Sequence, residues 1–295
     1  MERMLSNKKY VLFFMLPGML FYLVFYLIPI LATVQLSFTQ WDGISFENLK
    51  NIGTRNYFEL FTNDPVFWTG IKNTFVILLL QLAVQIPLTT ILALVLDSCV
   101  KGVKAYKTTF FIPVLFSATA VGLLWSRLYD VDYGLINRIF SSLGTGYMQK
   151  WLSSSKTVVL ALTAPMIWRS MGYYLLILYA GVKSIPKSYY EAALIDGCSA
   201  WQSAMKITLP LMRNAINVVV TLTAVAALRE YPLIYVMTNG GPFNSSSTPA
   251  IQMYIESFLK MRFGYGSSIA VVLVIECLLI SALIHKLFPD KDIQY

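Results

Sequence analysis

Four ionisable residues stand inside long apolar stretches of this chain: Arg169, Arg229, Glu230 and Glu276. A charged side chain in the middle of a bilayer is costly, so such residues tend to face a cavity or a charged partner. Two kinds of chemistry follow from these residue types. The arginines could pair with the glutamates and hold helices together, or the four groups could line a polar path. The sequence leaves both roles open.

Catalysis inside a membrane needs more than isolated charges. An enzyme would require paired carboxylates, a metal cluster with histidines, or a nucleophile beside a base. The sole histidine, His285, lies at the end of the last apolar stretch, where an anchor at the membrane edge is the better interpretation. No G-x-x-x-x-G-K-[ST] segment is present, so the chain has no loop to cradle nucleotide phosphates. We predict no catalytic residue, no metal site and no cofactor in this chain.

A short polar insert, residues 189–212 (YYEAALIDGCSAWQSAMKITLPLM), interrupts the apolar stretches. Two spacings, Ser188–Glu191 and Ser199–Gln202, fit capping boxes and predict two short helices. Gly197 lies between them and suits the left-handed residue that ends the first helix. The insert is therefore expected to be a folded helical hairpin.

The first of these helices is a poor candidate for lying on lipid. Interfacial helices carry a polar face rich in Lys and Arg, whereas this one sets Glu191 and Asp196 against Lys187 alone. Ala192 and Ala193 are small enough to let a partner approach closely. We expect the insert to dock onto another protein.

Composition explains the elements that surround the insert. The 295 residues are 57% hydrophobic and 13% charged, against about 25% charged in a soluble domain, which predicts a polytopic membrane protein. The net charge of +8 is scattered between apolar runs, so it indicates membrane topology and not nucleic-acid binding. Three cysteines far apart in the sequence, with neither disulfide nor zinc spacing, fit small buried hydrophobes: Cys99, Cys198 and Cys277.

Six stretches offer the roughly 20 apolar residues that a membrane-crossing helix needs: 10–37, 73–97, 108–126, 157–181, 214–237 and 267–284. The first is far longer than the roughly 7–15 residues of a signal-peptide core and is expected to remain as a helix. With the N-terminus inside, the inner pieces hold twelve Lys and Arg in 62 residues and the outer pieces nine in 94. This bias puts both termini and the insert in the cytoplasm.

The insert resembles the EAA loop of binding-protein-dependent ABC importer permeases. The residues that match it, and that the resemblance assigns to coupling with an ATPase, are Glu191, Ala192, Ala193, Asp196, Gly197, Ile207, Leu209 and Pro210. Ala204 departs from the family, which often has Phe there. Five further segments resemble carbohydrate-type permeases of the maltose and glycerol-phosphate kind: LPGMLFYLVFYLIPI, NYFELF, KNTFVIL, FIPVLFSATAVGLLW and DYGLIN. TNGGPFNSSST (238–248) resembles their motif after the fifth helix, where we expect a turn and not a phosphate loop.

The resemblance implies an all-α fold with six transmembrane helices and a type I importer (MetI-like) core in a bacterial inner membrane. It implies three regions: 1–69, the first helix and first outer loop; 70–286, the core with the coupling loop 183–213; and 287–295, a cytoplasmic tail. The implied partners are a second homologous permease, two ATP-binding subunits that hold ATP and magnesium, and an external solute-binding protein.

The same resemblance implies a sugar or oligosaccharide as solute, with a path lined from the fourth and fifth helices. The residues reached by counting from the two motifs are Met166, Trp168, Ser170, Tyr173, Thr223, Ala226, Ala227 and Glu230. Aromatic rings suit sugar stacking, and hydroxyl and carboxylate groups suit sugar hydroxyls. Import of an amino acid or peptide, an intramembrane enzyme and a regulatory membrane protein are the alternatives.

Overall fold

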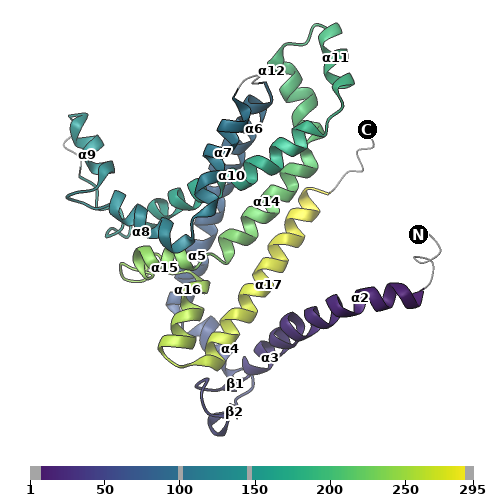
Figure 1. The fold of residues 1–295 in the computed structure, drawn as a ribbon. Coiled ribbons are helices and arrows are strands. Elements are labelled where there is room, and N and C mark those ends of the chain that lie inside the picture. The colour runs from purple at the N-terminus through teal and green to yellow at the C-terminus, as the bar shows by residue number, and fades with distance from the viewer. Residues whose placement is uncertain (1–7, 99–101, 145–147, 290–295) are drawn as a thin grey trace. The chain divides into compact units, whose positions relative to one another are not determined.

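The computed structural model describes residues 8–98, 102–144 and 148–289, which are predominantly helical (Figure 1). The chain divides into two compact units. The first unit comprises the residues up to Asp64 together with Gln252–Val272, and the second comprises Pro65–Ile251 and the residues from Leu273 onward.

The first unit combines a long apolar helix with two very short strands and a few short helices. In chain order its elements are α2 (Lys8–Tyr22), η1 (Leu23–Leu27), α3 (Ile28–Leu36), β1 (Thr39–Gln40), η2 (Phe46–Asn48), β2 (Lys50–Asn51), α4 (Arg55–Thr62) and η6 (Ile255–Leu259). Two helices, α16 (Pro249–Tyr254) and α17 (Phe263–Leu287), run across the boundary between the units. The strands are antiparallel, with Thr39 opposite Asn51.

One buried amide fixes the end of the long helix in this unit. The side-chain Nδ2 of Asn56 donates to the carbonyl oxygens of Ser37, at 2.9 Å, and Thr39, at 2.8 Å. Ser37 follows α3 and Thr39 begins β1, so α4 supplies the donors that this turn lacks. Gly264 at the start of α17 lies against the same turn, because a β-carbon there would come within 1.9 Å of the Thr39 carbonyl oxygen.

The second unit is a bundle of long helices with short ones at its ends. Its elements are α5 (Pro65–Leu80), η3 (Gln81–Gln85), α6 (Ile86–Ser98), α7 (Val103–Phe111), η4 (Ile112–Leu115), α8 (Ala118–Leu128), α9 (Leu135–Ser142), α10 (Val158–Lys183), α11 (Lys187–Ile195), α12 (Ala200–Ser203), η5 (Ala204–Thr208), α13 (Leu209–Leu211), α14 (Arg213–Leu228) and α15 (Pro232–Thr238).

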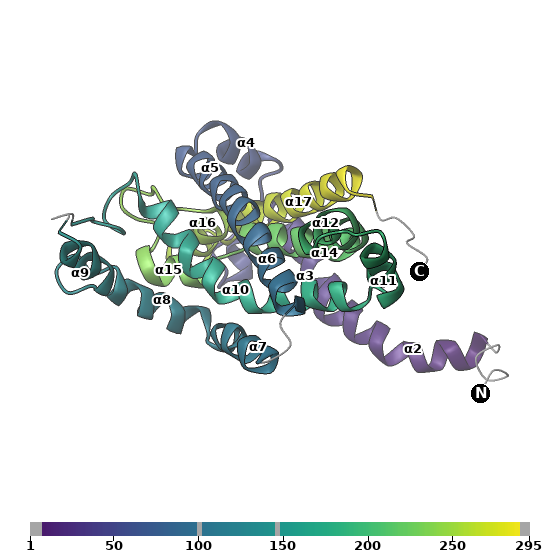
Figure 2. The same ribbon diagram turned by 90° about the horizontal axis from the view of Figure 1, so that it is seen from above.

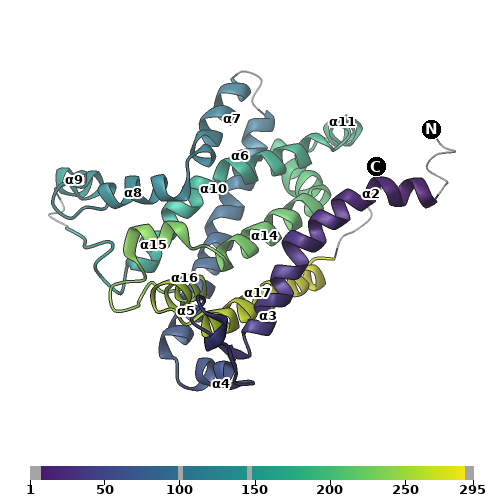
Figure 3. The same ribbon diagram turned by 60° about the horizontal axis from the view of Figure 1, so that its bottom comes forward.

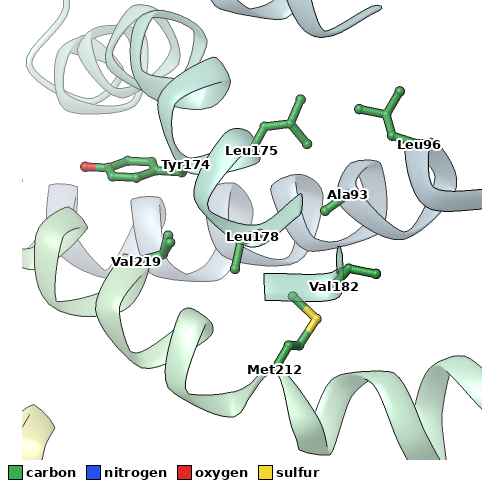
Figure 4. Close-up of a cluster of buried hydrophobic side chains, with 8 residues drawn as sticks. All are labelled: Ala93, Leu96, Tyr174, Leu175, Leu178, Val182, Met212 and Val219. Atoms are coloured by element: carbon green, nitrogen blue, oxygen red, sulfur yellow. The ribbon is translucent and has the colours of Figure 1, made fainter. Parts of the chain in front are cut away.

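The core of this bundle lies where α10 packs between α6 and α14. Its buried side chains come from these three helices and from the residue before α14 (Figure 4): Ala93, Leu96, Tyr174, Leu175, Leu178, Val182, Met212 and Val219. Further along α10, Gly172 permits contact with α7, because a β-carbon would lie 2.1 Å from the carbonyl oxygen of Phe110. Burial of these apolar groups fixes α10 as the central helix of the second unit.

Three wide, π-helical turns each end two residues before a proline. They are η1 before Pro29, η3 before Pro87 and η5 before Pro210. A proline inside an α-helix lacks a donor and clashes with the carbonyl four residues earlier. A single wider turn moves that carbonyl aside. Helices α5 and α6 therefore continue through η3 as one rod (Figure 2).

Two of the six stretches that were expected to cross the membrane are not single helices. The third, 108–126, breaks after η4, and the axes of Val103–Leu115 and Ala118–Leu128 differ by 97° (Figure 3). Phe116 adopts extended backbone, and the Ser117 hydroxyl caps α8 by accepting from the Ala120 amide. This local cap competes with helix continuation, which the apolar composition does not reveal.

The fifth stretch, 214–237, breaks between α14 and α15 at residues 229–231. Pro232 occupies the first turn of α15, where its missing N–H is tolerated. Glu230 assists by accepting a 3.4 Å hydrogen bond from the Leu233 amide. Helix α15 then packs on α8 at Gly122, where an added β-carbon would lie 3.4 Å from α15 atoms.

Three helices are long and apolar enough to cross a membrane: Leu12–Leu36, Pro65–Ser98 and Phe263–Leu287. The count rises to five if each of two bent pairs is one span, namely the pair described above and Ala200–Leu211 with Arg213–Leu228. Within the described residues the chain is thus a mostly helical membrane protein with three to five candidate spans.

Candidate functional site

The polar insert folds as two short helices joined by a left-handed glycine, as the sequence predicts. Helix α11 ends at Ile195, and Gly197 follows with φ of +74°. The Cys198 amide donates to the Ala193 carbonyl at 2.9 Å, and the Gly197 amide donates to the Leu194 carbonyl at 3.1 Å. These two bonds form a Schellman motif, which satisfies carbonyls that the helix end would leave unpaired.

The second helix of the insert begins with the predicted capping box. The Gln202 amide donates to the Ser199 hydroxyl at 3.3 Å, and the Ser199 amide donates to the Gln202 side chain at 2.8 Å. The capping box predicted at Ser188 is wrong. Helix α11 begins at Lys187, one residue before Ser188, and its N-cap residue is Pro186, which makes no side-chain hydrogen bond. Proline fixes its own φ near the value needed there, so the helix starts without a serine cap.

The two helices are tied together away from the turn. The Tyr190 hydroxyl lies 3.2 Å from the Thr208 hydroxyl, and Thr208 is buried. Ala193 is buried as well. The insert is therefore a rigid element and not a flexible linker.

Three large apolar side chains of the insert are exposed. Leu194 is 74% exposed, Ile195 87% and Trp201 71%. A folded loop that presents three large apolar side chains is typical of a docking surface. Figure 1 shows α11 and α12 at one end of the second unit.

The predicted coupling residues are distributed over both helices of the insert. Most of them are exposed: Glu191, Ala192, Asp196, Gly197 and Pro210. Ala193 is buried, and Ile207 and Leu209 are half-buried. After Pro210 the chain bends by 67° into α14, and Met212 at the bend belongs to the buried core of the second unit. The insert is thereby anchored directly to the helix bundle.

The predicted path residues on α10 are only partly accessible. Met166 is buried, Trp168 and Ser170 are half-buried, and Tyr173 is 46% exposed. The Trp168 ring lies 6.0 Å from the ring of Trp125 on α8 in an edge-to-face arrangement. These side chains therefore do not form one continuous surface in this conformation.

The path residues of the fifth stretch are more buried. Thr223 and Ala227 are buried, Ala226 is half-buried, and Glu230 lies just beyond the end of α14. Glu230 Oε2 is 3.9 Å from Arg169 Nη1 of α10. Two of the four charges discussed above are thus partners across the bundle, as the pairing interpretation expects.

A polar residue that sequence reasoning missed lies beside this region. Gln85, fully buried in η3, donates from Nε2 to the Ser170 hydroxyl at 2.6 Å, and Ser170 donates to the Met166 carbonyl. The only signal in the sequence is a glutamine pair, Gln81 and Gln85, within an apolar stretch just before a proline. The bond joins α10 to the α5–α6 rod next to the predicted path.

The TNGGP segment forms the predicted turn at a helix end. Helix α15 ends at Thr238, and Asn239 follows in left-handed conformation. The segment is held by Asn73 of α5, whose Nδ2 donates to the carbonyls of Ser245 and Ser247 at 2.9 Å each. This clamp connects α5 to a loop 172 and 174 residues later in the chain.

Arg229 is exposed directly after α14, and the last helix carries Glu276 and His285. Glu276 is half-buried and forms no ion pair within the described part of the chain, and His285 lies in the last turn of α17. The described residues contain no group of three or more His, Cys, Asp or Glu that could hold a metal ion.

Together these features define a helical membrane protein with three to five candidate spans and a folded loop between them in the described residues. The family comparison identifies it more narrowly. The chain belongs to the binding-protein-dependent transport system inner membrane component family, whose model matches residues 10–291. It is therefore a transport component of the inner membrane. The members of this family are ABC transporter permeases and not enzymes.

Relatives of full length support this membership. The chain is 31% identical to the probable ABC transporter permease protein PH1215 of Pyrococcus horikoshii, over 93% of this chain and 94% of that protein. It is 32% identical to the arabinooligosaccharides transport system permease protein AraP of Bacillus subtilis, over 96% of this chain and 89% of that protein.

The fold matches a solved transporter. The match is to a chain of the bacterial alginate ABC transporter in complex with alginate pentasaccharide-bound periplasmic protein, with a TM-score of 0.81, 21% identity, and coverage of 95% of this chain and 94% of that one. At this identity the likeness concerns the fold.

Proposed function

We propose that this chain is the permease subunit of an importer for a sugar or oligosaccharide. The full-length relatives support this substrate class, since AraP is a permease for arabinooligosaccharides. The chain pairs with a second homologous permease to enclose the path. Two ATP-binding subunits hold ATP and magnesium, this chain binds no cofactor, and an external solute-binding protein delivers the sugar.

The observation that carries the coupling role is the exposure of three large apolar side chains of the insert. Leu194, Ile195 and Trp201 are exposed on a loop that hydrogen bonds make rigid. Exposed apolar groups of this size are stabilised by burial in a partner. The eight coupling residues of the EAA loop lie in the same insert, and the cleft of an ATP-binding subunit is the partner we propose. Closure of the two ATPases then moves the insert and, through Met212, the core helices.

The six-span topology accommodates both breaks. The six spans are Leu12–Leu36, Pro65–Ser98, the bent pair Val103–Leu115 with Ala118–Leu128, α10, α14 and Phe263–Leu287, and Ala200–Leu211 stays in the cytoplasmic insert. The 26 residues of α10 extend about 39 Å and exceed the hydrocarbon thickness of about 30 Å. Both termini and the insert are then cytoplasmic. The three regions are 1–69, the first span and outer loop; 70–286, the core; and 287–295, the tail.

The path runs beside α10 and α14. Its lining residues, some exposed only after the bundle rearranges, are Met166, Trp168, Ser170, Tyr173, Thr223, Ala226, Ala227 and Glu230. Gln85 belongs with them, because it holds Ser170 in place. Burial of these groups fits a path that is closed in this conformation.

One experiment tests the proposal as a whole. The partner binding protein is screened by thermal shift against a panel of carbohydrates, amino acids and peptides. The complete importer is then reconstituted in proteoliposomes and assayed for ATP-dependent uptake of the stabilising compound. We expect uptake of a sugar that requires both ATP and the binding protein. Uptake of an amino acid or peptide instead would refute the substrate class, and uptake without ATP would refute the importer.

A labelling experiment tests the orientation. In a background whose native cysteines are replaced by serine, cysteine is introduced at Ser188 of the insert or at Ser141 of α9, both of which are exposed. An impermeant thiol reagent applied to intact cells should label position 141 and spare position 188. The opposite pattern would invert the topology.

A further inference from the structure

The first unit contains an open pocket of about 450 Å³ that the coupling loop and the path do not involve. It lies between the segment from β1 to α4 and the turn before α17. Its lining residues are mostly polar or charged: Gln40, Trp41, Asp42, Asn48, Lys50, Ile52, Arg55, Asn56, Glu59, Met261, Arg262 and Tyr265. In the proposed topology this region faces the outside of the membrane.

The carboxylates that line the pocket are committed to internal contacts. Asp42 accepts hydrogen bonds from the amides of Ile44, at 3.0 Å, and Ser45, at 3.2 Å, and from Asn48 Nδ2 at 2.9 Å. These bonds favour the ionised form and lower the pKa of Asp42. The negative charge of Asp42 is therefore taken up by hydrogen bonds within residues 42–48.

Arg262, one of the two arginines that line the pocket, is also engaged in ion pairs. Arg262 Nη2 lies 2.6 Å from Glu59 Oε1, and its Nη1 lies 3.2 Å from Glu256 Oε2. Lys260 adds a second contact to Glu256 at 2.7 Å. The guanidinium of Arg262 is thus enclosed by acidic groups and offers little charge to an outside molecule.

Two cations on the other wall of the pocket have no such partner. Lys50 in β2 and Arg55 at the first position of α4 form no side-chain hydrogen bond or ion pair with any described residue. Both are exposed and both line the pocket. With the acidic lining residues engaged, the pocket presents a net positive charge to any molecule that enters it.

Apolar side chains lie in the same part of the first unit as Lys50 and Arg55. Met261 lines the pocket, is exposed, and has a φ of +52°, which residues with a β-carbon rarely adopt. Leu49, which lies between the lining residues Asn48 and Lys50, is also exposed, as is Ile44, two residues after Asp42. Strain of this kind persists where the surroundings fix it and is frequent at binding sites.

We propose that this pocket receives a carboxylate-bearing loop of the external solute-binding protein, with Lys50 and Arg55 pairing with the carboxylate and Met261 packing against the loop. The inference rests on the proposed function and on the orientation that places residues 38–72 outside. A protein loop fits better than a free neutral sugar, because a sugar offers no charge to the two cations. It also fits the apolar rim, since protein interfaces combine an apolar centre with charged surroundings.

The test uses the complete importer in lipid nanodiscs and measures ATP hydrolysis as the solute-loaded binding protein is titrated. For Arg55→Glu and Lys50→Glu we expect the half-maximal concentration of binding protein to rise about tenfold or more, because charged surroundings steer association. The maximal rate should be unchanged. Added salt should weaken stimulation of the wild type more than that of the variants. Arg55→Gln, which removes charge without adding any, should lie between them.

Lys104→Glu is the matched control, since Lys104 is exposed on the opposite, cytoplasmic side in the proposed topology. It should leave the half-maximal concentration unchanged. Acid-to-lysine substitutions across the binding protein should include one that restores stimulation of Arg55→Glu. If the wild type responds and Arg55→Glu and Arg55→Gln respond at the same concentration, the docking inference is wrong. If no binding protein stimulates the wild type, the proposed function itself fails.

Discussion

The turn at Gly197 permits a quantitative test of the coupling loop. Its φ of +74° is accessible to glycine, and a β-carbon added there would meet no atom within 4 Å. Replacement by alanine therefore adds backbone strain without a clash, roughly 1–2 kcal/mol. Asparagine tolerates left-handed backbone better than alanine. A comparison of alanine with asparagine at this position therefore distinguishes backbone strain from the mere presence of a side chain.

A strain of this size lowers the population of the docking-competent turn by a factor of about 5 to 30. In proteoliposomes, Gly197→Ala should weaken association with the ATP-binding subunit by up to this factor and lower uptake accordingly. Gly197→Asn should retain most of the affinity. Association is measured by titrating the ATP-binding subunit onto immobilised permease, and uptake by transport of labelled solute.

Gly144 supplies a matched control. Its φ is +75° and its added β-carbon would also lie in open space, but it follows α9 and not α11. Gly144→Ala should carry the same strain without any change in ATPase affinity. Equal affinities for Gly197→Ala and wild type would refute the reasoning. Equal losses for Gly197→Ala and Gly197→Asn would show that bulk matters there and not backbone conformation.

Three further predictions concern the path, the clamp and the outer loop. Tyr173→Ala and Thr223→Leu should alter uptake to different degrees for different sugars while Tyr173→Phe retains wild-type preference; identical uptake of every accepted sugar by all three would remove these residues from the path. Asn73→Ala should cost about 1–3 kcal/mol, because buried carbonyls of loop 239–248 lose their donor, and thermal unfolding in detergent measures it; an unchanged midpoint would contradict the clamp. The lowered pKa of Asp42 stabilises its turn above the ordinary value of 3.8, and this contribution is lost as pH falls through the folded-state pKa. Proteolysis of the turn should therefore separate wild type from Asp42→Asn at pH 6, and the difference should shrink steadily as the pH is lowered below 3.8; a constant difference would count against it.

Local features of the insert could be predicted from the sequence because they depend on neighbouring residues. The turn at Gly197 and the capping box at Ser199 each involve partners within a few positions. The start of α11 was missed because Pro186 and Ser188 both offer a helix start, and the proline prevails.

Features that depend on distant partners could not be predicted. The bond from Gln85 to Ser170 joins residues 85 positions apart, and hydropathy treats both simply as polar interruptions. The break at Phe116 and Ser117 lies within a stretch whose composition favours a continuous helix. Besides the local cap by Ser117, α8 packs on α15 at Gly122, which admits the neighbouring helix. Such pairings follow from the assembled bundle and not from periodicity.

The clamp by Asn73 also has a consequence for the order in which the chain is made. Its two acceptors lie more than 170 residues downstream, so the amide has no native partner during most of synthesis. An unpaired amide within hydrocarbon costs several kcal/mol. We therefore expect the Asn73 end of α5 to stay hydrated at the membrane surface until the loop beyond α15 has been synthesised. Nascent chains halted before residue 239 should expose α5 to quality-control proteases, whereas chains halted after residue 251 should not.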